Sequence, residues 1–350
     1  MSNQKIKLAL WGIGRAGWNM HRTELECFKD MFEIVGGYDI IPERMTKLQE
    51  LYPECKSYPS ADAMLADPEI EVVAVTVRSK DHVDFDIRVL EAGKVCVAEK
   101  PVALNYADAL RLKAAADRFP GKLFCRHNRR FETCFHHVQE IIASGVLGDV
   151  YEIKLSRHNY NRRTDWQVFK DEGGGILNNW GPHLIDHALR FINAPLESVW
   201  SDMKQIAAMG DAEDHVKAVL RGTNGVTVDI EISGGVALPA PVYAVYGTRG
   251  SLVSVNEKTI QLKYLDMEKT EPPEPASHET QELPGTYAGR SPMTWIEKTI
   301  DTAPASGVKI TDFYRYVYEA VRENKPYPIS IDEAVEVVRV SDIIRAGGMK

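Results

Sequence analysis

Short apolar runs alternate with stretches of helical periodicity through the first third of the chain. The apolar runs, rich in β-branched residues, predict buried strands at residues 5–12, 33–39, 71–77 and 94–98. Between them, apolar residues recur every three or four positions, which predicts helices at residues 15–28, 42–51, 81–93 and 105–118, with a short helix after Ser60. Because strands that alternate with helices form a parallel sheet covered on both faces, we expect a doubly wound α/β unit.

Single residues support the ends of these helices. Pro42 suits the first turn of a helix, Ser60 and Asn105 are good N-cap residues, and Gly93 is a typical C-terminal stop. Near the end of the chain, the segment Ser-Ile-Asp-Glu that begins at Ser330 forms a capping box and predicts the start of the last helix.

The pattern changes after residue 122. One helix is expected to end at Gly145, and alternating apolar and polar residues at 149–160 then predict a strand with one open or partner-covered face. A helix follows the glycines at 173–175, and further strands, most of them in an antiparallel meander, are predicted at residues 197–204, 214–222, 225–233, 241–247, 250–255 and 259–264. Residues 266–292, rich in proline, glutamate and threonine, predict a loop or lid, and two helices close the chain. We therefore expect two domains, residues 1–122 and residues 123–350, the second an α+β domain with a large, mostly antiparallel open sheet.

Composition narrows the class of partner. The chain has 350 residues, 44% of them hydrophobic, and a net charge of −8 with no block of like charge, so we expect neither a nucleic acid nor a membrane as partner, but a small molecule. The five cysteines are scattered and never in C-x-x-C spacing, which favours reduced thiols and a cytoplasmic location. We expect no targeting segment, because glycine and arginine interrupt the apolar patch near the N-terminus.

A glycine motif follows the first predicted strand and opens the first predicted helix. Gly12, Gly14 and Gly17 have G-x-G-x-x-G spacing, which lets the backbone approach a pyrophosphate at the positive end of a helix. Asp39 closes the second strand 22 residues after Gly17 (39 − 17 = 22), where a carboxylate accepts hydrogen bonds from ribose hydroxyls and repels a 2′-phosphate. The alternative is a structural glycine turn with a helix-capping aspartate. The context favours a dinucleotide site with NAD preferred over NADP, formed by Gly12, Ile13, Gly14, Arg15, Ala16, Gly17 and Asp39.

A charge pair before a proline stands at the end of the fourth predicted strand. In doubly wound sheets ligands bind at the carboxyl ends of the strands, which is where Glu99 and Lys100 are expected. A lysine beside a cofactor can donate or accept a proton at the reacting oxygen. The simpler alternative, a surface Glu-Lys pair before a turn, is the common case for an isolated E-K-P.

The segment HLIDH offers two interpretations. His183 and His187 stand four residues apart with Asp186 between them, a spacing found in some zinc peptidases. An aspartate replaces the glutamate base, and no third ligand is evident downstream, so we expect no metal and interpret His187 as a helix-packing residue.

Several motifs together resemble the glucose–fructose oxidoreductase, inositol dehydrogenase and MocA family: GIGRAG at 12–17, Asp39, EKP at 99–101, NRRF at 128–131, the segment from the glycines at 173–175 through HLIDH, and YGTRGSL at 246–252. The resemblance covers nearly the whole chain. It implies an N-terminal Rossmann domain, a C-terminal domain whose open sheet often makes the interface of a homo-oligomer (a dimer or tetramer), and a tightly held nicotinamide cofactor.

The resemblance also implies roles for single residues. Lys100 matches a lysine near the reacting carbon, His183 matches the usual proton acceptor from the substrate hydroxyl, and Asp186 matches a family aspartate. Two positions depart from the family pattern. Asn179 stands where many relatives have an aspartate, on the helix face of His183. The segment Val77-Arg78-Ser79 replaces a frequent T-P-N, while His82 keeps its place; we count Ser79, His82, Glu99 and Lys100 among the cofactor contacts, and Arg78 is able to meet a phosphate.

The loop at 157–175 is expected to select the substrate. Trp166 can stack on a sugar face, while Arg157, Asn161, Arg163 and Lys170 can donate hydrogen bonds. The predicted substrate residues are Lys100, Arg163, Trp166, Asn179, His183 and Asp186.

We expect an NAD-dependent oxidoreductase that acts on a secondary hydroxyl of a cyclic polyol, sugar or glycoside, with Lys100 and His183 as the catalytic residues. Two alternatives stay open: a lyase or glycosidase that oxidises transiently and recycles NAD, and a regulator that binds NAD and sugar without turnover.

Overall fold

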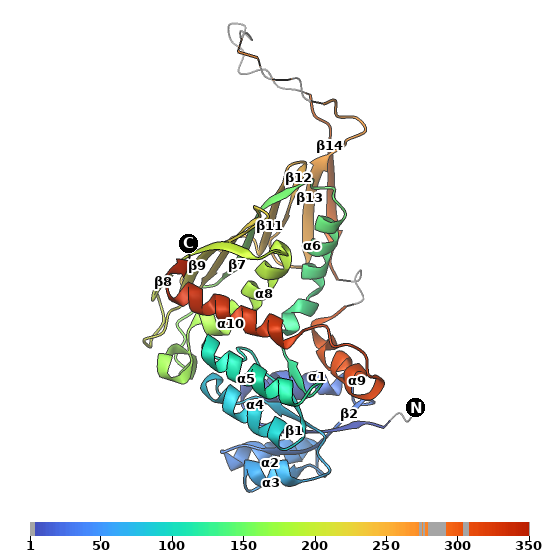
Figure 1. Ribbon diagram of the computed structural model, residues 1–350, viewed down its shortest axis with the longest axis vertical. Helices are drawn as coiled ribbons and strands as arrows, with labels where there is room; N and C mark the ends of the chain where they lie inside the picture. The colour runs from blue at the N-terminus through green and yellow to red at the C-terminus, as the bar shows by residue number, and fades with distance from the viewer. Residues whose placement is uncertain (1–3, 273–274, 276, 279–291, 304–307, 350) are drawn as a thin grey trace.

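The computed structural model describes residues 4–272, 275, 277–278, 292–303 and 308–349. It contains two sheets, one in the N-terminal third and one in the remainder of the chain (Figure 1). The predicted fold class is confirmed, with a parallel α/β sheet followed by a mostly antiparallel sheet. The boundary between residues 122 and 123 stays a prediction.

The N-terminal sheet has six parallel strands in the order β3-β2-β1-β4-β5-β6. Its strands are β1 (Ile6–Trp11), β2 (Phe32–Tyr38), β3 (Lys56–Ser57), β4 (Val72–Val75), β5 (Val95–Ala98) and β6 (Leu123–Cys125). The helical segments between and after them are η1 (Gly17–His21), α1 (Arg22–Glu26), α2 (Pro42–Leu51), α3 (Ala61–Ala66), η2 (Ser79–Asp81), α4 (His82–Glu91), α5 (Tyr106–Arg118) and η3 (Asn128–Phe131). The sequence-based strands and helices of this region are confirmed, although the first helix ends at Glu26 rather than at residue 28.

Side-chain hydrogen bonds confirm three of the predicted helix N-termini. The Ser60 Oγ accepts from Ala63 N at 3.1 Å, and the Asn105 Oδ1 accepts from Asp108 N at 2.9 Å. The capping box at Ser330 closes in both directions, because Glu333 N donates to the Ser330 Oγ and Ser330 N donates to the Glu333 Oε2. Each cap satisfies backbone donors that a helix N-terminus leaves unpaired.

The second sheet has nine strands in the order β14-β13-β12-β11-β7-β10-β9-β8-β15. They are β7 (Val150–His158), β8 (Leu196–Lys204), β9 (His215–Gly222), β10 (Thr227–Ser233), β11 (Tyr243–Gly247), β12 (Gly250–Ser254), β13 (Thr259–Leu265), β14 (Trp295–Asp301) and β15 (Gly348–Met349). The remaining segments are α6 (Thr133–Ala143), η4 (Trp166–Val168), η5 (Lys170–Glu172), α7 (Ile176–Asn179), α8 (Gly181–Ile192), η6 (Ile310–Asp312), α9 (Phe313–Glu323) and α10 (Ile331–Arg345).

Two features of this sheet differ from the predicted meander. Strands β7 and β10 pair in parallel, because β7 inserts between β10 and β11 in the middle of the sheet. Strands β14 and β15 were not predicted. Strand β14 begins three residues after the predicted loop or lid at 266–292, much of which lies outside the described residues.

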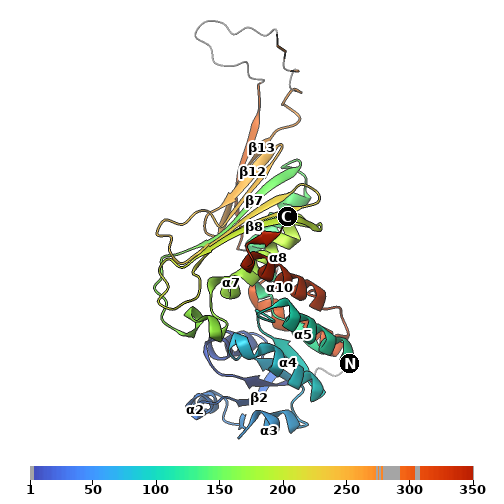
Figure 2. The ribbon, with the colours of Figure 1, turned by 60° about the vertical axis from the view of Figure 1, so that its left-hand side comes forward.

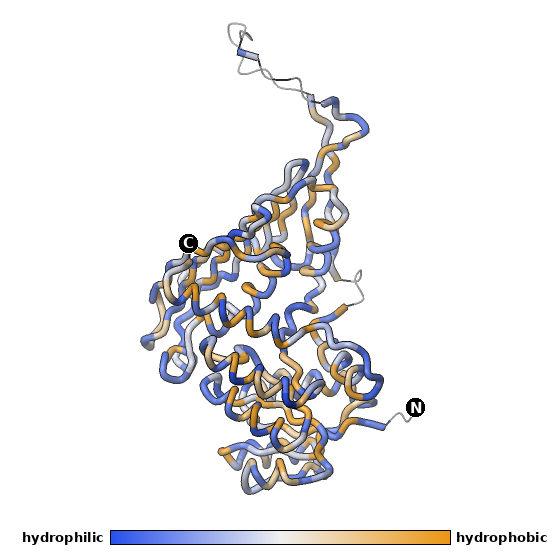
Figure 3. Tube along the Cα trace, in the orientation of Figure 1, coloured by the Kyte–Doolittle hydropathy of each residue, from blue (hydrophilic) through white to orange (hydrophobic). Residues whose placement is uncertain are grey.

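Helices cover both faces of the first sheet and one face of the second. In the first sheet, α1, α2 and α9 pack on one face and α3, α4 and α5 on the other. In the second sheet, apolar side chains of α6, α8 and α10 pack against one face, and Figure 2 shows no helix of the described chain on the opposite face. Hydrophobic and hydrophilic residues are interspersed along the strands and helices, and hydrophilic residues stand at many of the outer turns (Figure 3). The helix layer between the sheets therefore places α8 near the carboxyl ends of the parallel strands.

The last two long helices return to the N-terminal sheet. Phe313, Tyr314 and Val317 of α9 are fully buried in the core that includes Phe32, and the rings of Phe32 and Tyr314 lie 5.3 Å apart. Helix α10 packs against α5 on one side and α8 on the other. No helix in the described part of the chain is long and apolar enough to span a membrane.

Candidate active site

A cleft of about 1030 Å³ runs from the loops at the carboxyl ends of β1, β2, β4 and β5 to α7 and α8. The predicted site residues that line it are Gly12, Gly14, Arg15, Ala16, Asp39, Ser79, His82, Glu99, Lys100, Arg163, Trp166, Asn179 and His183. Three predicted residues, Ile13, Gly17 and Asp186, do not line it. Predicted site residues separated by up to 171 positions (183 − 12 = 171) therefore meet in one cavity.

The glycine motif forms the cradle that a pyrophosphate requires. Gly12 has a φ of +95°, a left-handed conformation that favours glycine, and a Cβ on Gly17 would collide with the carbonyl oxygen of Gly12. A Cβ on Gly14, in contrast, would meet only the Arg44 Nη1, at 3.6 Å. Gly12 and Gly17 are thus required by the fold itself, whereas Gly14 leaves the cleft side of the turn open to a ligand. This difference fits a dinucleotide at the start of the helix.

Asp39 is anchored to the same turn. Its Oδ2 accepts a hydrogen bond from Ile13 N at 2.6 Å, and its Oδ1 accepts one from Ile41 N at 2.9 Å. The Arg44 Nη1 lies 3.2 Å from the Asp39 Oδ2 and lines the cleft beside it. Ile13 therefore contributes to the site through its backbone amide, which anchors Asp39. The acidic side chain of Asp39 and the basic side chain of Arg44 both lie where the adenosine ribose of a dinucleotide would bind.

Lys100 lies at the opposite end of the cofactor half of the cleft. Its Nζ donates to the Asn179 carbonyl oxygen at 2.8 Å and lies 3.4 Å from the Asn179 Oδ1. Burial lowers the pKa of Lys100 to about 8; Glu99 acts against this change, while Arg15, Arg126 and Arg129 add to it. Lys100 is thus a held cation whose charge is lost in the mildly alkaline range.

His183 comes from the first turns of α8, and its ring packs edge-on against Trp180, with ring centroids 5.8 Å apart. Its Nδ1 is buried, and no described residue is hydrogen-bonded to it. Burial, followed by the charges of Lys100 and Arg129, holds the pKa of His183 well below its usual value. The imidazole is therefore neutral, and able to accept a proton, near neutral pH, where Lys100 is still charged.

Glu99 belongs to a buried ion-pair network. Its Oε1 accepts from the Arg126 Nη1 at 2.8 Å and contacts the His21 Nε2 at 2.7 Å, while the His21 Nδ1 contacts the Tyr314 hydroxyl. Arg126 also pairs with Glu24. Although burial acts to raise it, the pKa of Glu99 is lowered, mainly by Arg126. The network holds the strand end that carries Lys100 in a fixed position.

Asp186 lies in the interior rather than in the cleft. It accepts two hydrogen bonds from Arg130, including one from Nε at 3.0 Å, and Arg130 also pairs with Glu333 of α10. His187 packs as predicted: its ring stacks on Phe135 at 4.0 Å, and its nitrogens contact the Arg129 carbonyl oxygen and the Tyr243 hydroxyl. Among the described residues, no three His, Cys, Asp or Glu side chains are grouped as metal ligands.

The residues after β4 bridge the two halves of the molecule. Arg78 and Lys80 both pair with Glu172 of η5, at 2.7 and 2.9 Å. The ring of His82 is buried, with its Nδ1 2.8 Å from the Pro101 carbonyl oxygen. His82 thus supports the backbone that follows Lys100, while Ser79 and Arg78 line the cleft.

The substrate half of the cleft contains predicted and unpredicted side chains. Arg163 pairs with Asp165, and both line the cleft with Trp166. Asn128, Arg129, Gln167 and Trp180 also line it but were not predicted as site residues. Arg157 lies apart, in a network with Glu257. The sequence offered one signal for Asn128 and Arg129, their place in the NRRF motif after β6.

The fold and the cleft together define the class of protein, an NAD(P)-binding oxidoreductase. Residues 6–127 match the family described as "Oxidoreductase family, NAD-binding Rossmann fold", and residues 135–253 match "GFO/IDH/MocA C-terminal domain". The chain belongs to this GFO/IDH/MocA family, and it is an oxidoreductase of the kind that acts on CH–OH groups.

Named relatives span most of the chain at low identity. The scyllo-inositol 2-dehydrogenase (NADP(+)) IolW of Bacillus subtilis is 24% identical over 339 residues, which cover 96% of this chain and 91% of the relative. The myo-inositol 2-dehydrogenase of Thermotoga maritima is 26% identical over 271 residues, 73% of this chain and 78% of the relative. The crystal structure of an NAD-binding protein from Listeria innocua superposes with a TM-score of 0.80 at 23% identity, covering 98% of this chain and 95% of that one.

Proposed function

We propose that the protein is an NAD-dependent dehydrogenase that oxidises a secondary hydroxyl of a cyclic polyol, sugar or glycoside. The observation that carries this proposal is the convergence of the glycine cradle, Lys100 and His183 on one cleft. The names of the inositol dehydrogenases among the relatives support the substrate class.

Lys100 and His183 have different roles at the substrate oxygen. The bound nicotinamide supplies the hydride acceptor for the carbon. Lys100, as a cation, donates a hydrogen bond to the substrate oxygen and stabilises the negative charge that develops there. His183, held neutral by burial, accepts the proton that the hydroxyl releases. In the reverse direction the same two groups polarise the carbonyl and return the proton.

Asp39 supports a preference for NAD over NADP. Its carboxylate is anchored by two backbone amides and would face the ribose, where a 2′-phosphate brings like charge. Arg44 acts in the opposite direction, because its positive charge lies beside the same carboxylate and would attract a 2′-phosphate. Titration of both cofactors against the wild type, Asp39→Ala and Arg44→Ala tests the balance. We expect the wild type to bind NAD more tightly, Asp39→Ala to gain NADP affinity, and Arg44→Ala to lose what NADP affinity remains. Tighter NADP binding by the wild type would overturn the preference.

The function itself is tested by a substrate screen. Inositols, cyclic sugars and glycosides are incubated with the protein and NAD while the absorbance of reduced nicotinamide is followed. A net increase in that absorbance supports a dehydrogenase. Product formation without a net change in absorbance indicates an enzyme that recycles NAD, and binding without product indicates a regulator. The open face of the nine-stranded sheet stays the predicted interface of a dimer or tetramer.

A further inference from the structure

Arg129 is a cleft-lining cation that no part of the proposed chemistry uses. It stands on η3, directly after β6, and its carbonyl oxygen is 3.0 Å from the His187 Nε2. Its guanidinium lies over the ring of Trp180, with the central carbon 4.2 Å from the ring centroid, and its Nη1 pairs with Glu132. The backbone carbonyl of Arg129, one face of its guanidinium and its Nη1 are therefore held in place by neighbouring residues.

The free part of the guanidinium is the edge formed by Nε and Nη2. Within the described chain, no residue accepts a hydrogen bond from either nitrogen of Arg129. This edge presents two parallel N–H donors, the geometry that matches the two oxygens of a carboxylate. Because Arg129 lines the same cleft as Lys100 and His183, the open edge is available to a substrate at the catalytic residues.

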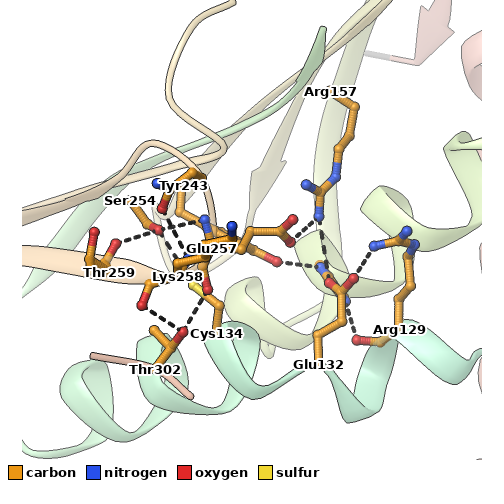
Figure 4. A network of polar contacts seen from close by, with 12 residues as sticks. Arg129, Glu132, Cys134, Arg157, Tyr243, Ser254, Glu257, Lys258, Thr259 and Thr302 are labelled. Atoms are coloured by element: carbon orange, nitrogen blue, oxygen red, sulfur yellow. Dashed lines mark hydrogen bonds and ion pairs between the residues drawn. The ribbon is translucent and has the colours of Figure 1, made fainter. Parts of the chain in front are cut away.

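A network behind Arg129 keeps it in place (Figure 4). Glu132 lies between Arg129 and Arg157, and Arg157 also pairs with Glu257. The guanidinium of Arg157 lies 5.1 Å from the centroid of the Trp180 ring, so both arginines contact the same indole. Burial and the adjacent Glu257 raise the pKa of Glu132, although the two arginines act against this. A proton on Glu132 leaves the four groups with a net positive charge beside the cleft.

The charges around the reacting end of the cleft do not cancel. The lining carboxylates Glu24 and Glu99 are both held by Arg126, and Asp165 is held by Arg163. Among the described residues, the Lys100 Nζ has only the neutral groups of Asn179 within hydrogen-bond distance. An anionic group on the substrate would thus meet Lys100 and Arg129 without displacing an existing ion pair of the lining carboxylates.

We propose that the substrate is a polyol acid, a sugar acid or carboxylated cyclic polyol, whose carboxylate binds the free edge of Arg129 while its secondary hydroxyl meets Lys100 and His183. This inference rests on the proposed dehydrogenase function. Arg129 is then the residue that separates acids from neutral polyols, and Glu132 and Trp180 position it.

Three forms of one sugar test the inference, because they share a ring and differ in charge: glucuronate, its methyl ester, and glucose, with the equivalent galactose series beside them. Turnover with NAD is measured for the wild type, Arg129→Met, Arg129→Lys and the control Lys80→Met, which removes a cation of the same cleft while its partner Glu172 stays paired with Arg78. We expect the wild type to favour the acid over its ester. Arg129→Met should raise KM for the acid by about tenfold to a hundredfold, the usual worth of a charge-assisted hydrogen bond, with little change in kcat. KM for the ester should change by less than about threefold, Arg129→Lys should recover only part of the loss, and Lys80→Met should keep the preference for the acid.

A second readout separates this inference from the proposed function. The thermal stability of the NAD-loaded protein is measured with each acid, ester and sugar phosphate, and NAD affinity serves as the check that each variant folds. If the acid stabilises the wild type but not Arg129→Met, the carboxylate site is supported, even if no compound reduces NAD. The failure of every compound to reduce NAD would overturn the dehydrogenase function alone. Oxidation of the neutral sugars at rates equal to those of the acids, with Arg129→Met lowering all of them alike, would overturn the carboxylate site and leave the dehydrogenase function standing. Stronger stabilisation by sugar phosphates than by acids would also overturn it.

Discussion

Asn179 is the neutral hydrogen-bond partner of the Lys100 ammonium, and replacing it with aspartate changes the pKa of Lys100 by an amount that can be worked out. The Lys100 Nζ lies 3.4 Å from the Asn179 Oδ1. A carboxylate oxygen in this place would interact with the ammonium by about 4–5 kcal/mol at an effective dielectric constant of about 20. Desolvation of the new charge and the access of water to the cleft offset much of this, and opposite charges at such distances raise a lysine pKa by about 1–3 units in practice.

The expected result is a shift in the alkaline limb of the activity profile. Lys100 acts as a cation, so activity falls as pH rises through its pKa of about 8. In Asn179→Asp the pKa is raised, the cation persists to higher pH, and the limb moves upward by at least about 1 unit. On the acid side the profile should stay flat down to pH 6.5, because the pKa of His183 lies well below that value. The measurement is kcat/KM against pH at saturating NAD, with a substrate from the screen.

Gln167→Glu is the matched control. The Gln167 Oε1 accepts from the Asn179 Nδ2 at 3.0 Å, so the substitution adds the same charge one side chain farther from Lys100. Its shift should be clearly smaller. The extent to which an acylating reagent labels Lys100, followed by mass spectrometry against pH, gives the same comparison without a substrate, because only the neutral amine reacts. An alkaline limb that stays in place in Asn179→Asp, or moves equally in both variants, would show that Lys100 is not the titrating group. Activity that rises through pH 8 would show that neutral Lys100 is the base.

Two further predictions concern the catalytic pair and the glycine turn. Lys100→Met and His183→Ala should each lower turnover by roughly a hundredfold or more while NAD affinity, measured by fluorescence titration, stays within a few-fold; near-normal turnover in either variant would remove that residue from the proton-transfer step. Gly14→Ala should keep its melting temperature but bind NAD weakly, because its Cβ meets only the Arg44 Nη1, at ordinary contact distance, on a turn that lines the cleft. Gly17→Ala should lower the melting temperature, because its Cβ collides with the backbone of Gly12. Equal melting temperatures for the two glycine variants would contradict the distinction between a glycine required by the fold and one required by the ligand.

Local sequence signals predicted four of the six strands of the N-terminal sheet, because β1, β2, β4 and β5 are short, mostly apolar runs separated by helical periodicity. The two-residue β3 and the three-residue β6 were not predicted. The same signals failed for β14. In this edge strand, Trp295–Asp301, only Ile296 and Ile300 are partly buried, and the other side chains are exposed. The segment therefore shows little of the apolar alternation that predicts a strand. The parallel pairing of β7 with β10 depends on contacts between residues about 75 positions apart (227 − 152 = 75), which local periodicity does not encode.

The prediction of the site was limited in the same way, because local sequence does not encode contacts between distant segments. Lys100 and His183 were recognisable from motif context, but the partners that hold the EKP segment, His21, Arg126 and Tyr314, come from three distant segments. Asp186 was assigned to the substrate because it matches a family aspartate three residues after the histidine. Helix α8 is buried on nearly every side, however, so a neighbouring position on the helix does not ensure a place in the cleft. Arg130 takes the Asp186 carboxylate because an unpaired charge in that interior would be costly.

The return of α9 to the first sheet has a consequence for biosynthesis. Residues 6–125 leave the ribosome early, yet Phe32 and its neighbours are covered by Phe313, Tyr314 and Val317, which are made nearly three hundred residues later. During translation this apolar face waits without its cover for roughly 15–60 seconds at about 5–20 residues per second. The nascent chain therefore exposes an apolar surface to which a chaperone can bind. A C-terminal truncation before α9 would uncover the core of the N-terminal sheet, the part of the protein that is synthesised first.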